Sequence, residues 1–154
     1  MMQRLAEHLY SVAITLWVGA LWAIGYLAAP ALFRLLDDRA LAGRLAGEMF
    51  TYVAWLGMAA AAYLLVFVAL RKEGGAFRSS VFWLVLCMLL LTVAGYFGVQ
   101  PILAQLKADS FPREVMESAL RDRFVAWHGV SSVVYLIQSL LGLVLVALQG
   151  RGLR

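Results

Sequence analysis

Four long apolar segments dominate this sequence and restrict what it can fold into. They cover about residues 8–33, 50–70, 80–99 and 124–148. Each has roughly the 20 or so apolar residues that a helix needs to cross the hydrocarbon core of a bilayer. A backbone inside lipid must pair its own polar groups, as an α-helix does. We therefore expect an all-α fold, an integral membrane four-helix bundle that forms a single transmembrane domain over residues 1–154.

The composition agrees with this class. Hydrophobic residues make up 64% and charged residues 14% of the 154 residues, whereas a soluble domain carries roughly 25% charged residues. The formal net charge of +4 is typical of basic residues that flank membrane spans. No basic-aromatic patch supports binding to nucleic acid. Cys87 is the single cysteine, so an intrachain disulfide is excluded, and we interpret it as a small apolar side chain.

Polar and small residues share one face of each segment when the segments are drawn as helices with about 100° per residue. In the last segment this face holds His128, Ser131, Ser132, Tyr135, Gln138, Ser139 and Gly142. In the first it holds His8, Ser11, Thr15, Gly19, Trp22 and Tyr26. In the second it holds Glu48, Thr51, Tyr52, Trp55, Ala59, Ala62 and Tyr63, and the third has a weaker stripe of Met88, Thr92, Gly95, Tyr96 and Val99. We predict that these stripes face the bundle interior, because lipid-facing surfaces are apolar.

The polar connections carry signals for helix ends. Pro30 predicts an end or a kink of the first helix near the membrane surface. Asp37 or Asp38 can cap the second helix, because a carboxylate accepts from the free amides of a helix start. Gln100-Pro101 marks the exit of the third segment near the far surface. Ser110-Phe111-Pro112 has the composition of a helix start that leads into the last segment.

Four spans place both termini on one side of the membrane. The terminal side carries Arg4, Arg71, Lys72, Arg78, Arg151 and Arg154 in short segments. The other side carries Arg34, Arg39, Arg44, Lys107, Arg113, Arg121 and Arg123 in longer loops. The higher density of basic residues favours cytoplasmic termini, and we expect the bacterial inner membrane as the location.

The same topology separates the two histidines. His8 begins the first segment on the terminal side, and His128 begins the last segment on the opposite side. At 1.5 Å per residue they lie roughly 25–30 Å apart, so they cannot ligate one metal within a single chain. We therefore predict no metal site and no bound cofactor, and a haem with one axial histidine is the alternative.

A polar pocket at the mouth of the bundle around His128 is the candidate ligand site. Its candidate residues are His128, Glu48, Arg34, Tyr52, Gln100, Tyr26, Ser131 and Tyr135. A histidine on a polar stripe near water could act as a ligand, proton carrier or substrate contact. The alternative is that His128 hydrogen-bonds a neighbouring helix at the interface, while Glu48 and Arg34 form a solvated ion pair beside the headgroups.

No signature of catalysis or nucleotide binding is present, and no catalytic residue is predicted. We expect a membrane protein that binds a hydrophobic small molecule, a lipid or a partner helix in the bundle interior. The alternatives are a haem-dependent membrane redox enzyme and an oligomeric small-solute transporter. Self-association is expected through small residues spaced by four, which let helices approach closely. These are Ser11, Thr15, Gly19 and Ala23 in one ridge, and Gly43 and Gly47 in another.

Several short motifs follow in an order that resembles a known membrane family. They are Trp17-Val18-Gly19-Ala20-Leu21-Trp22, Pro30-Ala31-Leu32-Phe33, Gln100-Pro101-Ile102, and Phe124-x-x-Trp127-His128-Gly129-x-Ser131 with Leu136 after it. The chain is similar over nearly its whole length to the domain of unknown function 4149, which is related to eukaryotic transmembrane protein 205. The resemblance implies a four-helix bundle with no established chemistry. Tyr135 stands where the family usually has Asn.

Overall fold

The structure is a computed structural model that describes residues 2–72, 75–109, 116 and 119–153. These residues form helices and no strand. The elements are α1 (Met2–Trp22), the π-helix η1 (Ala23–Ala28), α2 (Ala29–Leu35), α3 (Arg39–Arg71), the 3₁₀ turn η2 (Ala76–Arg78), α4 (Ser80–Val93), the π-helix η3 (Ala94–Val99), α5 (Gln100–Asp109) and α6 (Arg121–Gly152).

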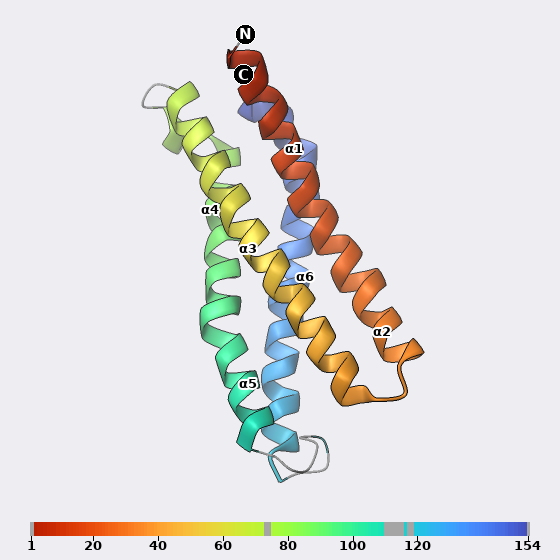
Figure 1. Cartoon of the computed structure of the whole chain (residues 1–154). Coiled ribbons are helices and arrows are strands. Elements are labelled where there is room, and N and C mark those ends of the chain that lie inside the picture. The colour runs from red at the N-terminus through yellow and green to blue at the C-terminus, as the bar shows by residue number, and fades with distance from the viewer. Residues whose placement is uncertain (1, 73–74, 110–115, 117–118, 154) are drawn as a thin grey trace.

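These elements join into long rods that alternate in direction, so that both termini lie at one end (Figure 1). Within the described residues, four rods are long and apolar enough to cross a membrane. They are Gln3–Leu35, Arg39–Arg71, Ser80–Asp109 and Arg121–Gly152. The expected all-α, four-helix membrane fold is confirmed. The helices extend beyond the apolar segments of the sequence because the polar residues outside the hydrocarbon core continue the same helical hydrogen bonding.

Pro30 of the first rod and Pro101 of the third rod each follow a π-helical turn. Pro30 lies at the start of α2 directly after η1, and Pro101 lies at the start of α5 directly after η3. Proline lacks an amide hydrogen and its ring crowds the carbonyl four residues earlier. A wider π turn next to it is a known way to keep such a helix continuous. The first rod therefore continues past Pro30 to Leu35, and the third continues past Val99 to Asp109.

The second helix begins as the sequence predicts. Asp38 is its N-cap residue, and its Oδ1 accepts a hydrogen bond from the Leu41 amide at 2.9 Å. The predicted helix start at Ser110-Phe111-Pro112 lies outside the described residues.

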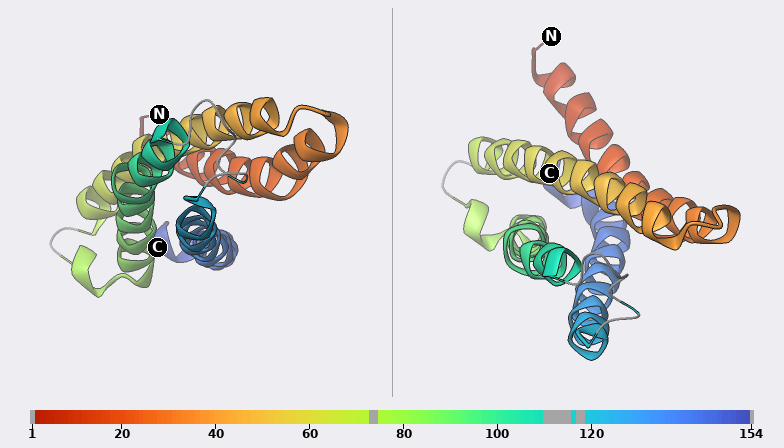
Figure 2. Two further views of the ribbon diagram at one scale, coloured as in Figure 1. Left: turned by 90° about the horizontal axis from the view of Figure 1, so that it is seen from below. Right: turned by 60° about the horizontal axis from the view of Figure 1, so that its bottom comes forward.

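Each long helix packs against two neighbours, in the ring order α1, α3, α4, α6. The buried apolar core lies in the half that holds the termini, which we call the terminal half: residues 2–22, 53–72, 75–93 and 138–153. Its core residues are Tyr10, Ile14, Trp17, Val18, Leu21, Val53, Ala60, Ala61, Leu64, Val68, Val81, Val85, Met88 and Leu145. We call the remainder the far half. Seen from the far end, the α2–α3 corner and the start of α6 stand on different sides of the molecule (Figure 2).

Rings that lie against glycines bring the helices together. The Trp17 ring lies so close to Gly57 of α3 that a Cβ on this glycine would sit 2.5 Å from the indole nitrogen. Tyr10 contacts Gly152 in the same manner, and its hydroxyl donates to the Gln149 carbonyl at 3.1 Å. Small-to-large contacts of this kind let α1 pack closely on both α3 and α6.

The prediction that all the polar stripes face inward is wrong for α1 and α3 and only partly right for α6. On α6 the stripe is buried at Gln138, Ser139 and Gly142, as predicted, but His128 and Ser132 are exposed. On α1, however, Thr15 and Gly19 are exposed, and on α3 the exposed residues include Glu48, Tyr52, Trp55, Ala59 and Ala62. The inward faces of α1 and α3 are mainly apolar or small instead.

Local hydrogen bonding explains why the stripes of α1 and α3 can face outward. The hydroxyl of Thr15 donates to the Ser11 carbonyl at 2.9 Å, and that of Thr51 donates to the Gly47 carbonyl at 3.1 Å. A hydroxyl that is satisfied by its own helix four residues back needs no partner on a neighbouring helix. Such residues therefore look polar in a helical wheel but do not decide which face is buried.

Candidate functional site

The predicted polar pocket around His128 is only partly assembled. His128 is exposed, and its ring stacks on Phe124 of the same helix at 5.8 Å with an interplanar angle of 11°. Glu48 and Arg34 are also exposed. Across the described residues, the structure gives neither an ion pair between Glu48 and Arg34 nor a hydrogen bond from the His128 ring to another helix.

Two of the predicted tyrosines do come together. The ring centroids of Tyr26 and Tyr135 are 6.2 Å apart, and Tyr135 also meets Phe50 edge-on at 5.1 Å. The Tyr135 hydroxyl donates to the Leu21 carbonyl at 2.6 Å, where η1 begins two residues later. Tyr135 therefore joins α6 to α1 and α3.

The remaining predicted residues lie apart from this pair. Tyr52 is 71% exposed on the outer side of α3, so it does not line the interior. Ser131 and Gln100 are half-buried, and their side chains form no hydrogen bond within the part of the chain that the structure describes.

Sequence reasoning missed the interhelical hydrogen bonds that the structure shows in the middle of the bundle. Gln138 Nε2 donates to Thr92 Oγ1 at 2.9 Å and ties α6 to α4, while Gln138 Oε1 is buried with no partner among the described residues. Trp55 Nε1 donates to the Tyr96 hydroxyl at 3.2 Å and ties α3 to η3. All four residues lie on the predicted polar stripes, but a helical wheel does not predict which residues of different helices form a hydrogen bond.

The hollow surface lies between α1 and α3, outside the core. One concavity has a volume of about 260 Å³ and is lined by Leu9, Val12, Ala13, Leu16, Leu56, Ala59, Ala60 and Tyr63. A second, of about 390 Å³, is lined by Ala20, Ile24, Met49, Tyr52, Val53 and Leu56. They share Leu56, so we treat them as one feature and call it the α1–α3 groove.

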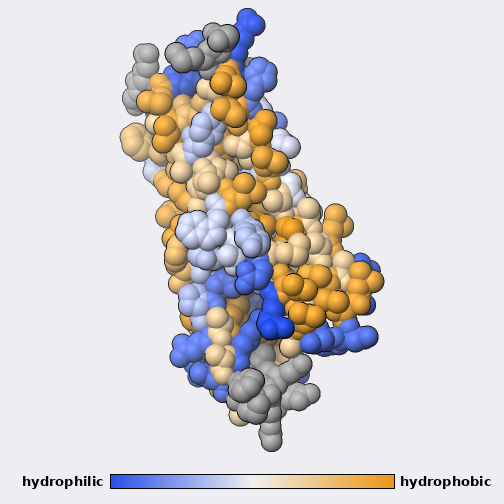
Figure 3. Space-filling view, viewed as in Figure 1, coloured by the Kyte–Doolittle hydropathy of each residue, from blue (hydrophilic) through white to orange (hydrophobic). Residues whose placement is uncertain are grey.

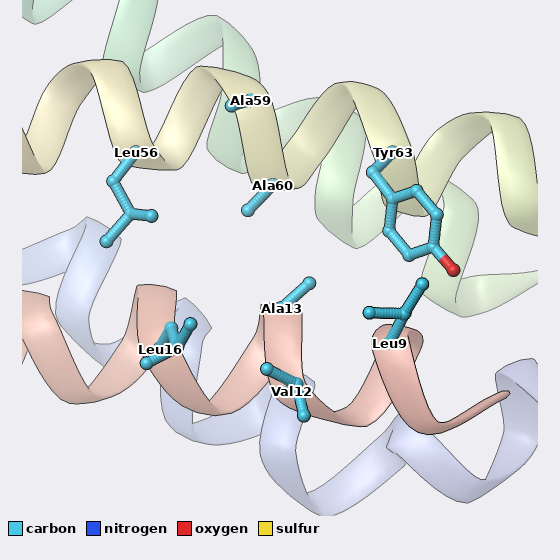
Figure 4. A pocket seen from close by; sticks show the side chains of 8 residues that line it. All are labelled: Leu9, Val12, Ala13, Leu16, Leu56, Ala59, Ala60 and Tyr63. Carbon is cyan, nitrogen blue, oxygen red and sulfur yellow. The ribbon is translucent and has the colours of Figure 1, made fainter. Parts of the chain in front are cut away.

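Side-chain size creates the first of these hollows. Ala13 of α1 and Ala60 of α3 point into the space between the two helices, where their methyl groups leave it unfilled (Figure 4). Larger side chains flank it, with Leu16 and Leu56 on one side and Leu9 and Tyr63 on the other. The lining is almost wholly hydrocarbon, so the groove is suited to an apolar ligand and offers no group for acid-base or nucleophilic chemistry.

Polar contacts link α1 and α3 at the terminal end of the groove. The Tyr63 hydroxyl donates to the Ala6 carbonyl at 2.9 Å. One turn or two beyond, Arg71 forms an ion pair with Glu7 at 2.6 Å and lies over the Phe67 ring at 5.9 Å. These contacts fix the distance between α1 and α3 where the groove meets the membrane surface.

Figure 3 shows one face of the molecule, with hydrophobic residues over much of its middle and hydrophilic residues gathered at the two ends. This distribution agrees with a chain that spans a bilayer. Within the described residues, no three His, Cys, Asp or Glu side chains converge as ligands for a metal ion. Cys87 is exposed on α4, where it faces away from the core.

The sequence matches the model of one known protein family. Residues 12–112, well over half of the sequence, match the family described as a domain of unknown function, DUF4149. The chain belongs to the DUF4149 family. The matched residues include the motifs at 17–22 and 100–102 of this DUF4149 protein, whereas the last-helix motif around His128 lies beyond the match. No curated protein and no solved structure matches the chain.

Proposed function

We propose that this DUF4149 protein binds a hydrophobic chain, such as the acyl chain of a lipid, in the α1–α3 groove. The observation that carries the proposal is that the two apolar hollows of the groove lie end to end between the first two rods, with Leu56 lining both. Its lining on the first rod runs from Leu9 of α1 to Ile24 of η1, which at 1.5 Å per residue is about 22 Å along the rod. That length is most of the roughly 30 Å hydrocarbon core of a bilayer.

An acyl chain suits the groove better than a partner helix does. Close helix association uses small residues that let two backbones approach. The groove instead has leucines and a tyrosine on either side of its alanines, an irregular surface that a flexible chain can follow. The small-residue ridge Ser11, Thr15, Gly19 and Ala23 contributes no residue to the lining.

Photocrosslinking tests the proposal. The protein in mild detergent would receive one equivalent of a phospholipid with a diazirine in its acyl chain, and mass spectrometry would locate the adducts. Adducts are expected on the groove residues Leu9, Val12, Leu16 and Leu56. An even spread over other exposed apolar residues, such as Leu90 and Leu140 at 60% and 50% exposure, would overturn it.

A matched pair of variants sharpens this experiment. Ala59 and Ala62 are both exposed alanines of α3, but only Ala59 lines the groove. The Ala59→Trp substitution fills the hollow and is expected to reduce groove adducts severalfold, whereas Ala62→Trp leaves them unchanged. Equal effects of the two substitutions would contradict a specific site.

The same preparation tests two other activities. A stoichiometric Soret band that His128→Ala abolishes would replace the proposal with a haem-dependent redox function. Uptake of a small solute by liposomes that contain the protein would replace it with transport, which for four spans needs an oligomer.

The proposed location is the bacterial inner membrane, with both termini in the cytoplasm. It is supported by the dense basic residues of the terminal side, Arg4, Arg71, Lys72 and Arg78 among them. Labelling of a cysteine at Gln3 by an impermeant maleimide tests the orientation, in a Cys87→Ala background. Labelling only after the membrane is broken agrees with cytoplasmic termini, and labelling of intact spheroplasts contradicts them.

Self-association through the ridge Ser11, Thr15, Gly19 and Ala23 is part of the proposal. Thr15, Gly19 and Ala23 are exposed, and a Cβ on Gly19 would meet nothing within 4 Å. A face this smooth leaves room for the backbone of a second copy. A monomeric mass both in detergent and in lipid nanodiscs would count against it.

A further inference from the structure

The two ends of the bundle differ in net charge. Among the described residues, the terminal end has five cations and one carboxylate: Arg4, Arg71, Lys72, Arg78, Arg151 and Glu7. The far end is nearly balanced, with Arg34, Arg39, Arg44, Lys107, Arg121 and Arg123 against Asp37, Asp38, Glu48, Asp109 and Asp122. Among the described residues the terminal end therefore has a net charge of +4 and the far end one of +1.

The α1–α3 groove leads toward this basic end. On α1, Arg4 precedes the lining residue Leu9 by five positions. On α3, Arg71 and Lys72 follow Tyr63 by eight and nine positions. At 1.5 Å per residue these cations lie about 7–14 Å beyond the lining. A chain that is bound in the groove with its polar head at the terminal end therefore has these cations beside that head.

These cations are not equally committed within the protein. Arg71 pairs with Glu7 and contacts the Phe67 ring. Arg4 is exposed and Lys72 is half-buried, and neither side chain has a hydrogen bond or an ion pair within the described part of the chain. Arg4 and Lys72 thus keep their charge for a partner outside the chain.

We propose that the ligand of the α1–α3 groove is an anionic phospholipid, with an acyl chain along the groove and its phosphate beside Arg4 and Lys72. This inference rests on the proposed function, which supplies the groove as the binding site. Arginine and lysine bind phosphate oxygens through charge-assisted hydrogen bonds. A zwitterionic lipid carries the same phosphate, but its own ammonium group cancels the net attraction to a surplus of cations.

Native mass spectrometry tests the inference with two probes that share their acyl chains, phosphatidylglycerol and phosphatidylcholine. Retention of each lipid would be compared between the full-length protein, the Arg4→Gln/Lys72→Gln variant and the Arg34→Gln/Arg44→Gln variant as a far-end control. The unmodified protein is expected to retain phosphatidylglycerol preferentially. In the terminal-end variant the ratio of retained phosphatidylglycerol to retained phosphatidylcholine should fall about fivefold for each charge removed. The far-end variant should keep the ratio of the unmodified protein.

The outcomes distinguish a failure of the anionic-lipid inference from a failure of the proposed function. Equal retention of both lipids, still reduced by Ala59→Trp, would overturn the anionic preference and leave the groove intact. Loss of the preference in the far-end variant alone would overturn the proposed headgroup position. Failure to retain either lipid would overturn both the inference and the proposed function.

Discussion

The two halves of the bundle are packed differently. In the terminal half, side chains from all four rods are buried, including Trp17, Leu64, Val85 and Leu145. In the far half, the buried residues of the described chain are only Ala29, Ala42, Ala46, Leu103 and Leu106. Along α6 the change is abrupt, because nothing between Arg121 and Ile137 is buried.

The difference shows which contacts hold this membrane protein together. Lipid is as apolar as the core, so the helices gain little from burying hydrocarbon and depend on close packing and hydrogen bonds. The terminal half has most of the close packing, with Trp17 against Gly57 and Tyr10 against Gly152. The far half has one contact of this kind, Tyr135 against Gly25, and otherwise looser contacts such as the Lys107 amino group 5.8 Å from the Phe124 ring. We therefore expect the terminal half to set the stability of the fold.

The largest expected effect comes from a methyl group placed in the packed half. Gly57→Ala puts a Cβ against the fully buried Trp17 ring, which cannot move aside without disturbing the core. We expect destabilisation of about 1–3 kcal/mol, measured as reversible unfolding in mixed detergent micelles.

Gly129→Ala is the matched control for this substitution. It adds the same methyl group to α6 where nothing lies within 4 Å. Because alanine favours a helix by roughly 0.5–1 kcal/mol over glycine, Gly129→Ala should be neutral or stabilising. Equal destabilisation by both substitutions would mean that Trp17 does not pack on Gly57.

The sequence predicts the fold well and the faces of the helices less well. Long apolar segments can only become spanning helices, so the four rods follow directly. The stripe of α6 was interpreted correctly at Gln138 and Ser139, whose burial matches their polarity. The stripe of α1 was misplaced because Thr15 bonds its own helix and needs no buried partner.

The candidate site was harder to predict for a geometric reason. The groove depends on how α1 and α3 are rotated against each other, and on which alanines this rotation brings face to face. Ala13 and Ala60 are unremarkable in the sequence, where alanine is common in the first two spans. The predicted pocket residues Tyr26 and Tyr135 do meet, but Tyr52 lies on the groove instead.

A second prediction concerns the border between the halves. Gln138 gives one hydrogen bond to Thr92 but buries an unpaired Oε1. A bond of this kind is worth about 0.6 kcal/mol in a membrane protein, whereas an unsatisfied buried group costs about 1–3 kcal/mol. Gln138→Leu should therefore stabilise the protein by up to about 1 kcal/mol in the same unfolding experiment. Thr92→Val, which leaves Gln138 Nε2 unpaired as well, should destabilise the protein. Destabilisation by Gln138→Leu together with stabilisation by Thr92→Val would show that the Gln138 amide is fully hydrogen-bonded.

A third prediction tests the ion pair at the terminal end. Glu7 and Arg71 are about one-third exposed, so water and salt screen their attraction. Glu7→Gln should cost about 0.2–1 kcal/mol at low ionic strength and less at 1 M salt. Glu48→Gln in the far half removes an exposed acid with no ion pair among the described residues, and it should change nothing. A larger loss of stability for Glu48→Gln than for Glu7→Gln would contradict the expectation that the terminal half sets the stability of the fold.

The smallest effect is expected at His128. Its ring is exposed and contacts Phe124 on its own helix, so His128→Asn should alter stability by less than about 0.5 kcal/mol. Lipid retention in the groove should also be unchanged, because His128 does not line it. A stable His128→Asn protein that fails to complement a gene deletion would instead make the far mouth around His128 the functional site.

The contrast between the halves is tested most directly along the stripe of α6 itself. Single spin labels would be placed at His128, Ser132, Ser139 and Gly142 in a Cys87→Ala protein, and their collision with dissolved oxygen measured in nanodiscs. The structure predicts low accessibility at Ser139 and Gly142, which are buried, and high accessibility at His128 and Ser132, which are exposed. Uniformly low accessibility along the stripe would contradict the account, because it would mean that the far half is packed as closely as the terminal half.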